Sequence, residues 1–257
     1  MDIDAYNESE FRRYEELLLQ RDRLEKEAAH YELDYLCEFG EAMTANLEAK
    51  LECIALKKSI AYCLERLNRG EKPERDAMES YVSARMAPYR EELIQLQIAR
   101  STARTGRHVL SPADAEEIKK IYRRLAKLLH PDLSPLTAEH EELREIFNDI
   151  IDAYRRNDLP RLRELEVLTE AKLRKLGIGH EVPPIEDLPG KIAAVEKEIG
   201  KILAGEPYTY GLLLSDADAV LAKKAALEAE LEETLRYRDS LQKTLDGLLA
   251  GNREGIA

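Results

Sequence analysis

Histidines, cysteines and paired acidic residues are the side chains of this 257-residue chain that could do chemistry. The cysteines, Cys37, Cys53 and Cys63, are odd in number and lack a CxxC spacing, so they indicate free thiols in a reducing compartment. The sequence contains no phosphate-binding loop, nucleophile elbow or HExxH motif. Acidic pairs such as Glu141-Glu142 are ordinary helix surface. We therefore expect no enzyme activity, no metal site and no cofactor.

His130 is the histidine with the most informative surroundings, because Pro131 and Asp132 follow it. Proline cannot continue a helix and disfavours helical geometry in the residue before it, so His130 is predicted at a turn. A metal site has little support, since His108 and His140 lie at unrelated positions with no carboxylate or thiol spacing to join them. The alternatives are an imidazole that caps helix carbonyls and one that contacts a partner.

The segment before this turn has two opposite faces. One face is apolar at helical spacing and consists of Ile118, Ile121, Tyr122, Leu125, Leu128 and Leu129. The other face is purely cationic and consists of Lys119, Lys120, Arg123, Arg124 and Lys127. In a chain whose formal net charge is −12, this is a local reversal of sign. It favours docking on an acidic partner surface, although a plain solvated basic surface is the alternative.

A second amphipathic helix is predicted from about Thr137 onward. Its apolar stripe consists of Leu143, Ile146, Phe147, Ile150, Ile151 and Tyr154. Two such helices joined by a short polar loop predict an antiparallel hairpin with the loop at its tip. We expect this tip, His130-Pro131-Asp132, to be exposed and therefore suited to contact a partner.

This pattern resembles the J domain of DnaJ-like co-chaperones. The run 118–126 and the His130-Pro131-Asp132 triplet resemble helix II and the loop of that family. The F-x-x-I-x-x-A-Y spacing of its helix III is reproduced by Phe147, Ile150, Ala153 and Tyr154. The resemblance implies a J-like domain over residues 109–176, about a quarter of the chain.

The resemblance also implies a function, that of a co-chaperone which docks on a DnaK-type (heat-shock seventy) ATPase chaperone and stimulates its ATP hydrolysis. In this family the cations of helix II steer the encounter, and the loop triggers the partner. The implied partner-binding residues are His130, Pro131, Asp132, Lys119, Lys120, Arg123, Arg124 and Lys127. Asp132 would pair with a cation of the chaperone. The alternative is a structural adaptor whose degenerate J-like fold serves only protein–protein interaction.

The chain also departs from the family. The short helix I, usually a Tyr-Tyr-x-x-Leu-Gly type segment, is missing before Ser111. We expect another element, the helix that ends near Ala103, to cover the apolar face of the hairpin in its place. A Gly/Phe-rich stretch and the four-fold CxxCxGxG zinc region are absent as well. The general substrate-binding parts of the large family members are therefore missing.

The rest of the chain predicts helical arms, so the fold class is all-α and elongated, with hairpins or coiled coils beside the J-like hairpin. We expect a helical hairpin over 1–72 with a turn near Gly40, the alternative being that Gly40 is a weak point in one continuous helix. A connecting helix is expected over 73–108. A Pro/Gly linker over 177–190 and a C-terminal hairpin or coiled coil over 191–257 follow. The arms would select a client or an assembly, and could also form a homodimer.

Composition narrows the partners and the compartment. The acidic net charge argues against nucleic acid and anionic membranes as partners. The first four residues are Met-Asp-Ile-Asp, which does not fit a signal peptide, and no apolar run approaches the roughly 20 residues of a membrane span. We expect a cytoplasmic protein.

Overall fold

The computed structural model describes residues 3–105, 110–134, 136–177 and 187–250, and within these ranges the regular structure is entirely α-helical. The all-α prediction is thereby confirmed. The chain divides into two compact units, each assembled from distant parts of the sequence. Unit 1 lies within Met1–Glu32 and Gly106–Leu212, and unit 2 within Leu33–Thr105 and Leu213–Ala257. The expected division into consecutive segments therefore differs from the one observed.

Helix α1 (Ile3–Asn68) is a single helix, so the hairpin expected over 1–72 is wrong. Gly40 lies within it, and one glycine in a helix costs only about 1 kcal/mol relative to alanine. A Cβ built at Gly40 would lie 3.4 Å from Cγ of Arg100 in α2 (Arg75–Thr105), an ordinary van der Waals distance, so the position can accept an alanine. Helix α1 ends at Asn68, near the boundary expected at residue 72, and Gly70 follows it with a φ of +74° that suits glycine.

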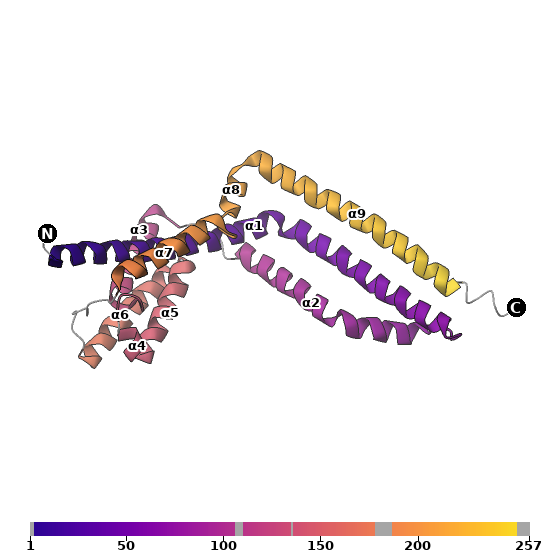
Figure 1. Ribbon diagram of the computed structural model, residues 1–257, viewed down its shortest axis with the longest axis horizontal. Coiled ribbons are helices and arrows are strands. Elements are labelled where there is room, and N and C mark those ends of the chain that lie inside the picture. Colours follow the sequence, from indigo (N-terminus) through magenta and orange to yellow (C-terminus); the bar gives the residue numbers. More distant parts are fainter. Residues whose placement is uncertain (1–2, 106–109, 135, 178–186, 251–257) are drawn as a thin grey trace. The chain divides into compact units, whose positions relative to one another are not determined.

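Unit 2 is built from α1, α2 and α9 (Ala217–Ala250), with α1 between the other two (Figure 1). An apolar cluster near the end of α1 joins all three helices through Tyr62, Cys63, Met78 and Leu245. Ion pairs between the helices add to this packing, for example the pair of Lys50 in α1 with Glu230 in α9 at 2.7 Å. The connecting helix expected over 73–108 corresponds to α2, and Pro88 does not end it.

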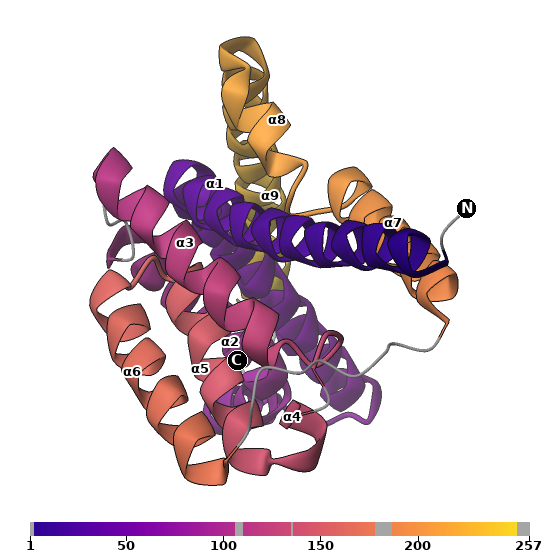
Figure 2. The same cartoon turned by 90° about the vertical axis from the view of Figure 1, so that its left-hand side faces the viewer.

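Unit 1 contains the predicted hairpin. Its helices are α3 (Pro112–Leu129), α4 (Leu136–Glu139), α5 (Glu141–Arg155), α6 (Leu159–Leu176) and α7 (Leu188–Ala204), together with the first part of α1. Helices α3, α5 and α6 pack on one another in pairs, as Figure 2 shows. The apolar residues predicted for α3 are buried in this core, except for Leu128, which is partly buried. Helix α7 belongs to this unit, whereas α9 belongs to unit 2, so the hairpin expected over 191–257 is not formed.

The apolar face of the hairpin is covered by helices that the sequence did not indicate for this role. Leu159, Leu162, Leu165 and Leu173 of α6 complete the core, and Leu19 of α1 packs against it. The helix that ends near Ala103 is therefore not the one that takes this role. A second cluster joins α1 to α7 and includes Leu133 of the loop after α3. No helix among the described residues is long and apolar enough to cross a membrane.

The continuity of α1 can be tested at Gly40. In a helix interior, Gly40→Ala is expected to raise the free energy of unfolding by about 0.5–1 kcal/mol, whereas at a turn it would lower it. Gly70→Ala is the matched control, because an L residue at positive φ is strained by about 1–2 kcal/mol. Denaturant unfolding of both variants measures the difference, and a destabilising Gly40→Ala would contradict the single helix.

Candidate partner-docking site

The turn after α3 is fixed by backbone hydrogen bonds around His130. Its N–H donates to the carbonyl of Ala126 at 2.8 Å, the last bond of the helix. Its carbonyl accepts from Leu133 N–H at 2.9 Å and from Ser134 N–H at 2.8 Å. The N–H of Asp132 donates to Nδ1 of the His130 ring at 3.1 Å. His130 therefore ends the helix and organises the turn with both its backbone and its ring.

The three residues of the tip differ in exposure. Pro131 is exposed, and the Asp132 side chain is 45% exposed, but His130 is only 3% exposed. The imidazole meets the ring of Phe147 in α5 edge to face, with the centroids 5.4 Å apart. The expectation of an exposed tip thus holds for Pro131 and in part for Asp132, and it is wrong for His130.

Helix α1 provides the other neighbours of His130. Nη2 of Arg21 lies 3.1 Å from Nε2 of the ring, and Oδ2 of Asp22 lies 3.8 Å from the same nitrogen. Asp22 also accepts a hydrogen bond of 2.6 Å from the hydroxyl of the buried Tyr122. Sequence reasoning missed Arg21 and Asp22 as neighbours of the predicted site, because Arg21, for example, lies 109 residues before His130 and gives no local signal.

Burial lowers the pKa of His130 below its usual value of 6.5, against the opposing effect of the Asp22 and Asp132 carboxylates. The ring is therefore neutral near pH 7. A neutral imidazole has a single acceptor nitrogen. It can accept from the Asp132 N–H or from Arg21, but not from both at once. The hydrogen bonds from the Asp132 N–H and from Arg21 to the ring therefore cannot form at the same time.

The five cations of α3 are all exposed, as the sequence predicts, but three of them are paired within the chain. Lys119 pairs with Glu116 at 3.0 Å, Lys127 pairs with Glu15 of α1 at 2.7 Å, and Arg124 pairs with Glu166 of α6. Lys120 and Arg123 form no ion pair with any residue that the structure describes.

Aromatic packing holds the two helices of the hairpin in register. The rings of Tyr122 and Tyr154 stack with their centroids 3.8 Å apart. Nζ of Lys26 lies 3.9 Å from the centroid of the Tyr154 ring. Burial, with a smaller contribution from Lys119, lowers the pKa of Lys26 to about 8. The tyrosine that resembles the last position of the family's helix III is therefore clamped between α3 and α1.

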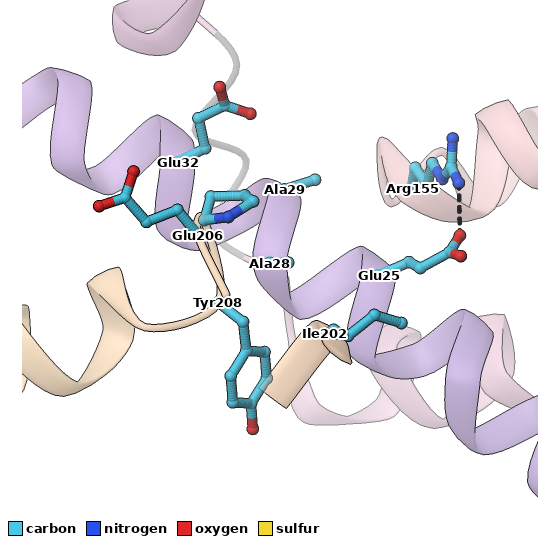
Figure 3. Close-up of a pocket in the computed structure, with 9 residues that line it drawn as sticks. Glu25, Ala28, Ala29, Glu32, Arg155, Ile202, Glu206 and Tyr208 are labelled. Atoms are coloured by element: carbon cyan, nitrogen blue, oxygen red, sulfur yellow. Dashed lines mark hydrogen bonds and ion pairs between the residues drawn. The ribbon is translucent and has the colours of Figure 1, made fainter. Parts of the chain in front are cut away.

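A pocket of about 330 Å³ lies where α1 and the end of α7 diverge (Figure 3). Its lining includes Glu25, Glu32, Glu206 and Tyr208, and Glu25 pairs with Arg155 at 2.7 Å. The lining residues include no serine, cysteine or histidine, so the pocket lacks a nucleophile–base pair. We find in it no arrangement for catalysis.

A basic helix that ends in His-Pro-Asp and packs antiparallel to an F-x-x-I-x-x-A-Y helix defines the J-domain class of fold. Residues 108–157 match the family model of the DnaJ domain. The match covers about a fifth of the chain, and it confirms the resemblance of this segment to the J domain that the sequence shows. J-domain proteins are in general co-chaperones rather than enzymes. No curated protein and no solved structure matches the chain.

The lowered pKa of His130 predicts how stability depends on pH. As the pH falls below 6.5, the unfolded chain binds a proton that the folded ring resists, so the free energy of unfolding decreases. His130→Gln removes this contribution. Between about pH 7.5 and about pH 5.5 the variant should therefore lose less stability than the wild type. Denaturant unfolding at both pH values measures this, and equal losses would contradict a neutral buried ring.

Proposed function

We propose that this chain is a co-chaperone that docks on a DnaK-type ATPase chaperone and stimulates its ATP hydrolysis. The observation that carries the proposal is the position of the His130-Pro131-Asp132 turn, at the end of a helix with an exposed basic face. Both parts lie within the segment that matches the DnaJ domain. In this proposal the chain does no chemistry of its own, and its effect lies in the partner's active site.

The basic face provides steering. Lys119, Lys120, Arg123, Arg124 and Lys127 lie on one exposed side of α3. Opposite charge on a partner surface raises the rate of encounter and sets orientation more than it raises affinity. Lys120 and Arg123 are available for such contacts. Neither forms an ion pair with a described residue, so docking has no such pair to break.

The turn provides the trigger. Pro131 is exposed, and Asp132 has a half-exposed carboxylate that can pair with a cation of the chaperone. His130 is buried, so its role is to hold the turn through the bond from the Asp132 N–H to Nδ1. His130 acts in this proposal as a positioning residue for Pro131 and Asp132.

A structural adaptor is the second candidate. It is favoured by one observation, that Arg21 of the same chain lies against both His130 and Asp132. Such contacts within one chain are expected if the tip serves only internal packing. The two candidates differ in whether a chaperone responds to the tip.

Unit 2 is the part that we propose for selecting the client or the assembly. It has exposed apolar side chains at Ile94 and Ile98 on α2 and at Leu221 on α9. Such side chains are available for contacts with a client or, in a homodimer, with a second copy. As part of the same proposal, the co-chaperone acts in the cytoplasm, without nucleic acid or membrane partners.

Single-turnover ATP hydrolysis by a DnaK-type chaperone tests the proposed function. The wild-type chain is expected to accelerate hydrolysis, and His130→Gln is expected to abolish the acceleration, because glutamine has no ring nitrogen at the position of Nδ1 to accept from the Asp132 N–H. Equal rates with the two proteins would favour the adaptor.

The steering role predicts a salt-dependent loss. Replacing Lys120 and Arg123 by alanine should slow association with the chaperone several-fold at low ionic strength. The loss should fade at high salt, where the Debye length shortens. Lys72→Ala with Lys243→Ala is the control, since it removes the same charge from exposed positions in unit 2. Stopped-flow association measures the rates, and equal losses in the two double variants would rule out a specific basic face.

A further inference from the structure

The chain supplies from within itself the charges that the proposed partner would have to bring. A docking chaperone must offer an acidic surface to α3 and a cation to Asp132. Helix α1 offers both, with Glu15 on Lys127 and Arg21 on Asp132. We propose that the part of α1 that contains Glu15 and Arg21 is an autoinhibitory segment, here called the clasp. It competes with the chaperone for α3 and the turn. The inference rests on the proposed function and adds its regulation.

Arg21 is the centre of the clasp. Its Nη1 lies 3.6 Å from Oδ2 of Asp132 and 3.3 Å from Oε2 of Glu198 in α7. Its Nη2 lies 3.1 Å from Nε2 of His130 and 3.1 Å from Oδ1 of Asp22. The side chain is only 18% exposed. One guanidinium thus ties α1, α7 and two residues of the turn together.

The clasp and the chaperone exclude each other for an electrostatic reason. A partner cation that approaches the Asp132 carboxylate would meet Arg21 beside it, and two cations at one carboxylate repel each other. An acidic partner surface over Lys127 would likewise meet Glu15. Docking therefore requires that this part of α1 leave the turn.

Helix α7 keeps α1 in place. Tyr14, Leu18 and Leu24 of α1 pack with Ile192, Val195 and Ile199 of α7 in one cluster. Leu133, the residue after Asp132, is buried in the same cluster. The apolar contact and the Arg21 contact therefore reach the turn from the same side, and loosening either one exposes it.

The polar contacts of the clasp are suited to release. Water reaches one partner of each ion pair, since Asp132 and Lys127 keep side-chain exposures of 45% and 52% while Arg21 and Glu15 keep 18% and 14%. Such access by water weakens the attraction between the charges. Only one of the two hydrogen bonds offered to the His130 ring can form at a time. In this proposal the tip therefore exchanges between a state that the clasp covers and a state that is open to the chaperone.

Arg21→Met in the full chain tests the clasp, because methionine keeps the apolar stem and removes the charge. We expect the variant to stimulate single-turnover ATP hydrolysis of the chaperone several-fold more than the wild type. The gain should disappear in the double variant with His130→Gln. Arg23→Ala is the matched control, since Arg23 lies on the same helix and pairs with Glu27 of that helix. It should behave as wild type.

Glu15→Gln is a second, independent variant, which weakens the clasp at Lys127 and should act in the same direction. Amide hydrogen exchange at Asp132, Leu133 and Ser134 gives a readout without the chaperone. The exchange should be faster in Arg21→Met than in the wild type, while core amides of α5 stay protected in both.

The outcomes separate the two proposals. Equal, His130-dependent stimulation by the wild type and Arg21→Met, with unchanged exchange at the turn, would overturn the clasp and leave the co-chaperone function standing. No stimulation by any of these proteins would overturn the proposed function, and the clasp with it.

Discussion

Pro131 has no N–H to donate, and this missing donor governs the arrangement of the whole tip. Helix α3 ends at Leu129, and its last bond runs from the N–H of His130 to the carbonyl of Ala126. The carbonyl of His130 accepts from the N–H groups of Leu133 and Ser134, which closes a tight turn. The turn reverses the chain so that α5 can pack against α3. It also places the imidazole against Phe147 instead of in solvent.

The fold of the hairpin could be predicted from the sequence because its determinants are local. The apolar positions of α3 recur at helical spacing, Ser111 and Pro112 begin that helix, and Pro131 stops it. The pairing of Tyr122 with Tyr154 follows once both helices are in register. The five cations of α3 could be placed on the exposed side for the same reason.

The surroundings of the hairpin could not be predicted, because they depend on partners far away in the chain. Gly40 has the same local sequence whether it lies in a turn or faces Arg100 inside a helix, so periodicity could not distinguish the two. Arg21 and Asp22 look like ordinary helix surface until His130 and Tyr122 are brought to them. The helical stripe of α7 predicts that it packs somewhere, but does not name α1 and Leu133 as its neighbours.

The single acceptor nitrogen of His130 gives the tip a choice between two tautomers. With the proton on Nε2, Nδ1 holds the amide of Asp132, and Arg21 keeps only its carboxylates. With the proton on Nδ1, Nε2 is free to receive Arg21, and the Asp132 amide has lost its acceptor. The movement of one hydrogen between two ring atoms therefore decides whether the imidazole supports the turn or the helix that covers it. The tautomer of His130 therefore links two properties of the turn, namely whether the Asp132 amide is held in place and whether α1 covers the turn.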